Sequence, residues 1–227
     1  MNSDSSNSSL PGLPDSTEVL AFAAGPFETN CYVLVDRSGG DATPASPASP
    51  IQGRAVVIDP GMGAWDVVNA QAQERNFTVE KVVLTHGHID HIRDAAAFGV
   101  PVHVHPLDRF FLEESLAGSP FAELFDVENM GVPSEIVELE GEIEMGGETF
   151  EVFHMPGHSP GHVMFRVGGL VIGGDVLFRG GVGRTDLPGC SPEDMLLSLK
   201  KLTVEFDDDD LVLPGHGPAT TVGEEKR

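Results

Sequence analysis

Side chains that bind transition metals recur along this chain at short intervals. Three imidazoles and one carboxylate fall within residues 86–91, and three further groups each stand in a glycine-rich turn that follows an apolar run. The seven residues are His86, His88, Asp90, His91, His158, Asp175 and His216. Neutral imidazole and carboxylate together suit zinc, iron or manganese. Seven ligands are too many for one tetrahedral ion and fit two ions that share a bridging group.

A lone histidine is more often a surface or core residue than a metal ligand. The segment Thr85-His-Gly-His-Ile-Asp-His91 differs, because the buried-strand pattern of Val82-Val83-Leu84 ends directly before it. Packing alone does not require three imidazoles and a carboxylate so close together, so this segment indicates metal binding. Asp175 and His216 would each fit an ordinary turn if taken alone, and the whole set strengthens both assignments.

The elements that must position these residues follow from the hydrophobic pattern. We expect strands near Glu18–Ala23, Asn30–Val35, Ala55–Ile58, Lys81–Leu84, Val102–Val104, Phe150–His154, Val163–Val167, Leu170–Ile172 and Leu211–Leu213. We expect helices near Ala64–Arg75, His91–Phe98, Pro106–Leu116 and Pro192–Leu202. The last helix is the clearest, because Ser191 stands at its N-cap and Pro192 at its first position. Helices beside two runs of strands predict an α+β fold in which two sheets pack between helical layers.

Seven short segments carry a family resemblance. They are Asn30-Cys-Tyr32, Asp59-Pro-Gly61, Thr85-His-Gly-His-Ile-Asp-His91, Pro156-Gly-His-Ser-Pro-Gly-His162, Gly174-Asp-Val-Leu-Phe178, Gly183-Arg-Thr-Asp186 and Leu213-Pro-Gly-His-Gly-Pro218. In this order, over roughly residues 17 to 222, they resemble the metallo-β-lactamase superfamily. Within it they are similar to the glyoxalase II-like (hydroxyacylglutathione hydrolase-like) thioester hydrolases. The resemblance implies an αββα sandwich with metals at one edge.

The resemblance also implies a role for each ligand. The first ion would be held by His86, His88 and His158. The second ion would be held by Asp90, His91 and His216, and Asp175 would bridge the two. Many metallo-β-lactamases carry Cys where this chain has Asp175, which favours a thioester over a lactam as substrate. We therefore expect two divalent ions, with zinc first and iron or manganese as alternatives.

The chemistry of such a site is hydrolysis. A water that bridges two divalent ions loses its proton near neutral pH, and the resulting hydroxide attacks a carbonyl. A thiolate leaves without a strong general acid, because its pKa is only about 8.5, whereas an amine would need protonation. The expected substrate is therefore a small-molecule thioester such as S-lactoylglutathione. Asp90 is expected to be a hydrogen-bond partner of the hydroxide as well as a ligand.

Residues that recognise the substrate are less clearly marked. Arg179 and Arg184 follow Asp175 in a glycine-rich loop and are the candidates to hold a substrate carboxylate, although solvent-facing arginines are the alternative. In larger glyoxalase II enzymes a Lys and a Tyr bind glutathione at the places where this chain has Arg184 and Asp186. The remaining histidines are His103, His105, His154 and His162, which we interpret as strand residues or loop supports rather than ligands.

Three other functions compete with this interpretation. A persulfide dioxygenase of the same superfamily would use a single iron, held here by His86, His158 and Asp175. A non-catalytic metal-binding scaffold is the second alternative, since fold does not fix function. Cleavage of a phosphodiester is the third, and the formal net charge of −23 argues against it and against any nucleic-acid partner.

Composition bounds the domain organisation. Residues 1–16 are rich in Ser and Asn and lack Lys and Arg, so they predict a disordered tail rather than a signal peptide. Residues 17–227 then form one metallo-β-lactamase-like hydrolase domain, with a Pro/Ser-rich loop at about 38–53. Two cysteines make no disulfide framework, which favours a reducing, cytoplasmic setting. No apolar run is long enough for a membrane span, so no membrane association is expected.

Overall fold

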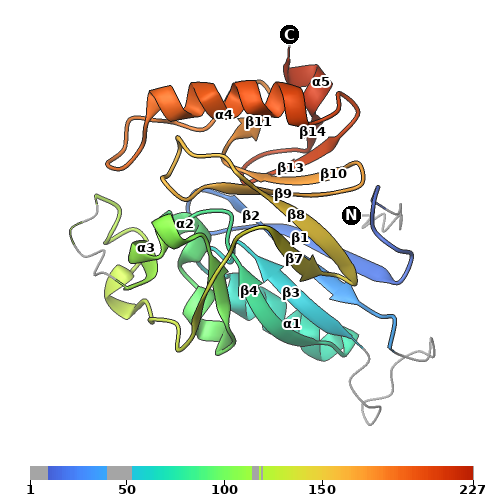
Figure 1. Ribbon diagram of the computed structural model, residues 1–227. Helices are drawn as coiled ribbons and strands as arrows, with labels where there is room; N and C mark the ends of the chain where they lie inside the picture. Colours follow the sequence, from blue (N-terminus) through green and yellow to red (C-terminus); the bar gives the residue numbers. More distant parts are fainter. Residues whose placement is uncertain (1–9, 40–52, 114–117, 119, 227) are drawn as a thin grey trace, which may run out of the picture.

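Two six-stranded mixed sheets form the centre of the molecule (Figure 1). The computed structural model describes residues 10–39, 53–113, 118 and 120–226. In order across the first sheet, the strands are β1 (Thr17–Ala24), β2 (Thr29–Asp36), β3 (Arg54–Ile58), β4 (Thr78–Val83), β5 (Val102–Val104) and β6 (Ile136–Glu138). Across the second sheet they are β14 (Thr220–Thr221), β13 (Leu211–Pro214), β10 (Leu170–Gly174), β9 (Val163–Val167), β8 (Glu148–His154) and β7 (Glu142–Met145). The short strands β11 (Leu177–Phe178) and β12 (Gly181–Val182) pair with each other.

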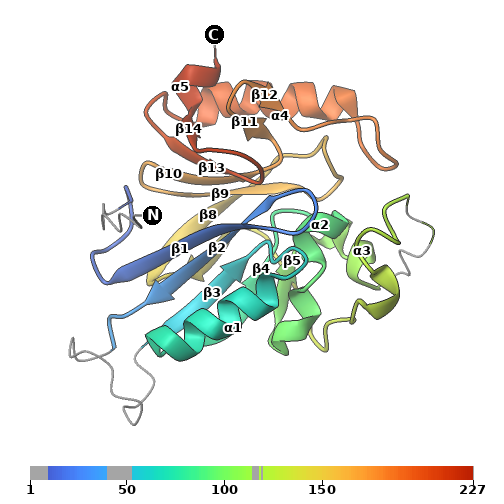
Figure 2. The same cartoon turned by 180° about the vertical axis from the view of Figure 1, so that it is seen from behind.

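Helices cover the outer faces of both sheets (Figures 1 and 2). The longer ones are α1 (Ala64–Arg75) on the first sheet and α4 (Pro192–Glu205) on the second. The shorter helical segments are α2 (Ile89–Ile92), η1 (Ala95–Phe98), η2 (Pro106–Asp108), α3 (Phe110–Glu113), η4 (Val127–Asn129) and α5 (Val222–Glu225). None of the helices in the described segments combines the length and the apolar character that a bilayer crossing requires.

Strand alternation divides the apolar side chains into three cores. In β2, Cys31 and Val33 face the helical layer that contains α1, whereas Tyr32 and Leu34 face the second sheet, because successive side chains of a strand point to opposite faces. The layer between the sheets contains the buried rings Phe150 and Phe165 among others. A third core joins the outer face of the second sheet to α4. The predicted αββα arrangement is therefore confirmed.

Several predicted elements differ in detail from the structure. Ser191 caps α4 as expected, since its side chain accepts a hydrogen bond from the Asp194 amide at 3.1 Å. The expected helix over 91–98 is instead two short segments, α2 and η1, with a break at Arg93 and Asp94. The Asp94 carboxylate accepts hydrogen bonds from the Gly63 and Trp65 amides, at 2.8 and 3.1 Å, and so binds the start of α1. Strands β6, β7, β11, β12 and β14 were not expected from the sequence.

The predicted tail and insertion lie partly outside the described residues. These are residues 1–9 of the tail and 40–52 of the loop. Residues 10–16 of the predicted tail are described, and Leu10 and Leu13 pack against the core between the sheets. The expected helix over 106–116 comprises η2 and α3, and its last residues, 114–116, lie outside the described part.

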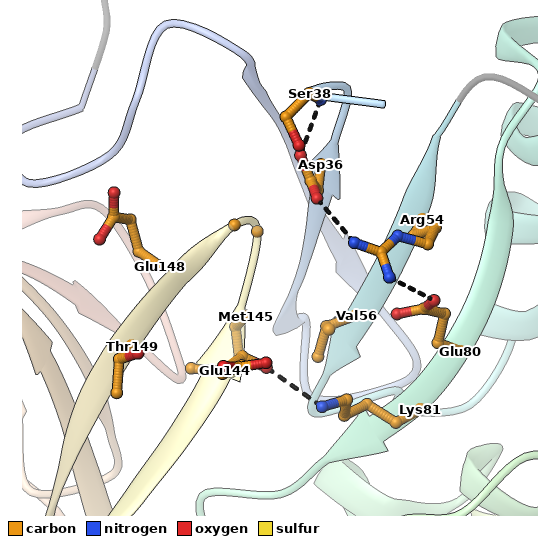
Figure 3. Close-up of a pocket in the computed structure, with 12 residues that line it drawn as sticks. Asp36, Ser38, Arg54, Val56, Glu80, Lys81, Glu144, Met145, Glu148 and Thr149 are labelled. Atoms are coloured by element: carbon orange, nitrogen blue, oxygen red, sulfur yellow. Dashed lines mark hydrogen bonds and ion pairs between the residues drawn. The ribbon is translucent and has the colours of Figure 1, made fainter. Parts of the chain in front are cut away.

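Charged side chains line a cleft of about 310 Å³ between the sheets, at the end where β2 finishes (Figure 3). Arg54 pairs with Asp36 at 3.2 Å and with Glu80 at 3.6 Å. Lys81 reaches across to the second sheet and donates to the Glu144 carbonyl at 3.2 Å. Both basic groups are therefore committed to neighbours that stabilise this end of the sandwich.

Candidate metal centre

The predicted metal ligands gather at the opposite end of the strands. His86 follows β4, His158 follows β8, Asp175 follows β10 and His216 follows β13. Strands β10 and β13 are parallel, so their carboxyl ends meet at the same edge of the second sheet. The sheets are joined at this edge, because the main-chain amide of Asn30 donates to the Gly215 carbonyl at 2.7 Å.

Three groups of three side chains converge there, and one of them, His86, His91 and Asp175, links the other two. His86, His88 and His158 each offer one atom within 4.8 Å of the others, and Asp90, His91 and His216 form a second such group. Asp175 lies between them: its carboxylate oxygens are 3.3 Å from His158 Nε2 and 3.4 Å from His91 Nε2. The structure thus brings all seven residues together at one edge of the sandwich. Their individual roles as ligands stay predictions.

A buried chain of hydrogen bonds fixes the outer nitrogens of two imidazoles. Asp59 accepts from the Thr85 hydroxyl at 2.6 Å and from His91 Nδ1 at 2.9 Å. Because the Thr85 proton is directed at Asp59, the Thr85 oxygen accepts from His86 Nδ1 at 3.0 Å. Both imidazoles therefore carry a proton on Nδ1 and direct Nε2 inward, which leaves Nε2 as the atom that could bind an ion.

Main-chain oxygens orient two more imidazoles in the same way. His158 Nδ1 donates to the Arg184 carbonyl at 2.7 Å, and His216 Nδ1 donates to the Phe27 carbonyl at 3.0 Å. Their Nε2 atoms face Asp175. The main chain at position 215 packs tightly against Asp175, since a Cβ there would lie 2.0 Å from Asp175 Oδ1. Position 215 therefore requires glycine.

Unpartnered atoms inside the cluster test whether it suits a cation. His86 Nε2, His91 Nε2 and Asp175 Oδ1 are buried, and none of them has a hydrogen-bond partner. A buried lone pair without a partner is costly, and three that point at one space are explained together by a positive ion. Imidazole nitrogen and carboxylate oxygen are ligands for zinc, iron and manganese. The residues present therefore fit divalent transition-metal ions.

Burial and neighbouring charges shift the pKa values of the cluster in different directions, and Asp90 and Asp175 also raise the pKa of the buried His91. Burial, with nearby imidazoles, lowers the pKa of His86 well below its usual range and that of His88 to about 3, so both are neutral at pH 7. Burial would raise the pKa of Asp90, but His91 and His216 outweigh it and lower that pKa to about 2. Burial also lowers the pKa of His216, and hydrogen bonds to Asp175 and Asp90 outweigh this and raise it to about 9.

Asp108 is a further residue of the site that the sequence interpretation missed. It is fully buried at the end of η2. Its carboxylate accepts from the Gly87 amide at 2.8 Å, from the Ser159 hydroxyl at 2.6 Å and from the Gly161 amide at 2.5 Å. Gly87 lies between two predicted ligands, and Ser159 and Gly161 follow His158. Asp108 therefore joins the two loops that carry the first group of ligands.

The weaker histidine candidates lie around the cluster rather than in it. His162 Nε2 accepts from the Asp175 main-chain amide at 2.9 Å, so it supports the loop that carries Asp175. His105 lies just past β5 at the N-cap of η2, not on the strand, and its ring stacks on His154 at 4.2 Å between centroids. His103 lies within β5.

A pocket of about 370 Å³ opens above the cluster. Among the residues that line it are five predicted ligands, His88, Asp90, His158, Asp175 and His216. Arg184 also lines it and binds Asp186 through two hydrogen bonds of 2.7 and 2.8 Å. Arg179 is not part of the lining and donates to the Ala219 carbonyl. Substrate binding by Arg179 and Arg184 stays a prediction, and the pocket favours Arg184.

Comparisons with known proteins agree with this geometry. Residues 48–216 match the model of the metallo-beta-lactamase superfamily. The hydroxyacylglutathione hydrolase GloC of Haemophilus influenzae is 37% identical over 219 residues, which cover 92% of this chain and 94% of the relative. The crystal structure of TTHA1623 in a di-iron-bound form has a TM-score of 0.70 and 35% identity, covering 92% of this chain and 97% of that one. The crystal structure of BLEG-1 B3 metallo-beta-lactamase has a TM-score of 0.74 and 30% identity, covering 91% and 95%. The chain therefore belongs to the metallo-beta-lactamase superfamily.

Proposed function

We propose that this metal-dependent hydrolase cleaves a small-molecule thioester, as glyoxalase II enzymes do. The observation that carries the proposal is the position of the pocket, whose lining includes five predicted metal ligands. A carbonyl placed in this pocket lies directly over the cluster. The relative from Haemophilus influenzae, named a hydroxyacylglutathione hydrolase, supports the thioester assignment.

Two divalent ions complete the proposed site, with zinc as the first candidate. The ligand set accepts zinc, iron or manganese, and the di-iron-bound form of TTHA1623 supports iron as the competing ion. When bound, such ions polarise a carbonyl and lower the pKa of water, so that hydrolysis needs no separate strong base. Asp90 stays ionised at neutral pH and its Oδ2 accepts from the Thr29 hydroxyl at 2.9 Å, which holds the carboxylate in place.

The composition of the pocket favours a leaving group that departs without a proton. Apart from the predicted ligands, Arg184 is the one polar side chain among the described residues of the lining. A guanidinium has a pKa above about 12 and cannot act as a general acid at neutral pH. A thiolate departs readily under these conditions, whereas an amine does not. This argument favours a thioester over an amide or a lactam.

A lactam is the second candidate substrate, because the fold is similar to that of BLEG-1 B3 metallo-beta-lactamase. Apart from the predicted ligands, the described pocket lining holds no side chain that could protonate an amine at neutral pH, which argues against it. Hydrolysis of a chromogenic cephalosporin by the same protein preparation measures this activity directly.

Thiol release from S-lactoylglutathione by the purified, metal-analysed protein tests the proposal. Turnover that disappears in His88→Ala would support thioester hydrolysis. If the metal-loaded protein releases no thiol from this or any other thioester, the proposal is wrong. Tightly bound iron at one ion per chain, with oxygen uptake on glutathione persulfide, would then favour the dioxygenase.

A further inference from the structure

Aromatic side chains from three separate segments line the pocket beside the predicted metal ligands. Phe27 lies in the turn between β1 and β2, Phe111 in α3, and Phe121 in the segment that follows α3. The ring of Phe27 contacts that of Phe121 edge-on, at 5.2 Å between centroids, and that of Phe125 at 5.0 Å. We call Phe27, Phe111 and Phe121 the aromatic wall.

The aromatic wall is fixed directly to the predicted ligands. Phe27 accepts a hydrogen bond from His216 through its carbonyl oxygen. The ring of Phe111 lies edge-on to that of His88, at 5.6 Å between centroids. It also packs on Gly87, where an added Cβ would lie 2.3 Å from the Phe111 ring. The apolar surface therefore begins at the metal cluster itself, and Ile89, Leu187 and Pro188 extend it.

Away from the predicted ligands, the pocket offers little positive charge to an anionic substrate. Apart from the predicted ligands, Arg184 is the only basic side chain in the described lining, and Asp186 binds its guanidinium through two hydrogen bonds. The formal net charge of the protein is −23. A substrate whose larger group is uncharged and apolar has the smallest desolvation cost on entering such a pocket. Its burial is also favourable, because it removes apolar surface from water.

We propose that the acyl group of the substrate is uncharged, apolar and large enough to contact the aromatic wall. This inference rests on the proposed thioester hydrolysis and specifies its substrate class. The C–S bond breaks as water adds to the carbonyl carbon, and the products are a carboxylic acid and a thiol. Negative charge develops on the departing sulfur, and an apolar wall would penalise it. We therefore place the acyl group against the aromatic wall and the departing sulfur near Arg184, whose guanidinium stays charged while it is paired with Asp186.

Four thioesters test the inference on the metal-loaded protein. They combine a 3-phenylpropanoyl or a lactoyl group with N-acetylcysteamine, which is uncharged, or with glutathione. We expect kcat/KM to be about tenfold or more higher for the 3-phenylpropanoyl ester on both thiols, since burial of a phenyl group favours binding. Equal or better hydrolysis of the lactoyl esters would overturn the inference and leave the proposed function intact. No hydrolysis of any of the four would reject both.

Phe27→Ala and a control variant locate the preference in the wall. The exposed fraction of Phe27 is 38%, so its truncation is expected to leave the protein folded. The ratio of kcat/KM between the two acyl groups should fall at least about threefold in this variant. Trp65→Ala is the control, because Trp65 has the same exposed fraction and does not line the pocket. An unchanged ratio in folded Phe27→Ala, or an equal fall in the control, would overturn the role of the wall.

Discussion

Replacing Asp108 by asparagine should weaken metal binding at the first group of ligands selectively. The carboxylate now receives three hydrogen bonds, from Gly87, Ser159 and Gly161. In Asp108→Asn, the amide oxygen can still accept from the Gly161 amide, and the Ser159 hydroxyl can rotate to accept from the new NH₂ group. The Gly87 amide then faces a donor and has no acceptor. The loop between His86 and His88 thereby loses its attachment.

The cost can be estimated from these contacts. A buried amide left without an acceptor costs about 1–3 kcal/mol, and two charge-assisted bonds that become neutral lose roughly 1 kcal/mol each. Burial raises the pKa of Asp108, so removal of the charge relieves part of this cost. We expect a net loss of about 2–4 kcal/mol in the free energy of unfolding. Loss of a partner that orients metal ligands typically lowers affinity about 10–100-fold, or about 1.4–2.8 kcal/mol.

Metal titration in competition with a chelator, followed by elemental analysis, measures the effect. One of two ions should dissociate at a chelator concentration about 10–100-fold lower than in the wild type, while the other is retained. The matched control is Asp210→Asn, because Asp210 is also buried, accepts from the Asp207 amide at 3.0 Å and lies at the far end of β13. The control should lose stability without losing metal affinity. Wild-type affinity for both ions in folded Asp108→Asn would refute the reasoning.

Three further predictions concern the ligands, the substrate and pH. His86→Ala and His91→Ala should each lower the ion count measured by elemental analysis, and unchanged counts in both would contradict the ligand assignment. Arg184→Ala should raise KM without changing the ion count, because its guanidinium lies at the pocket; an equal KM would remove that role. Burial, with Lys81, lowers the pKa of His103 from 6.5 to about 4, so the unfolded state binds more protons in this window. Stability measured by urea denaturation should therefore fall more steeply from pH 7 to pH 4 in the wild type than in His103→Gln, and parallel curves would contradict this.

The grouping of the predicted ligands was predictable because most of them stand just after strands that can be recognised in the sequence. A buried strand such as β4 or β13 reads as a short apolar run, and the turn after it is where a ligand can project from a sheet edge. The gathering of Asp175 and His216 follows from the parallel pairing of β10 with β13. The αββα layers were also predictable from the sequence, because the order of apolar and polar residue types along each strand indicates which faces are buried.

The supporting contacts were not predictable, because they depend on segments far apart in the chain. Asp108 looks like an ordinary turn residue, and its role depends on amides 21 and 53 residues away. Asp94 likewise interrupts a helical pattern for a tertiary reason, since it binds the start of α1. Strand β6 is only three residues long, too short for a recognisable sequence pattern, and it forms because it pairs with β5.

The two sheets contribute ligands jointly, and this has a consequence for folding. Four predicted ligands follow β4 of the first sheet, namely His86, His88, Asp90 and His91. The other three follow strands of the second sheet, namely His158, Asp175 and His216. Ions held between the two sheets would act as reversible cross-links that close long loops, much as a disulfide does. Such a site can assemble only after the sheets dock. Metal binding would then occur late, after the two sheets have folded and docked, and would not nucleate folding.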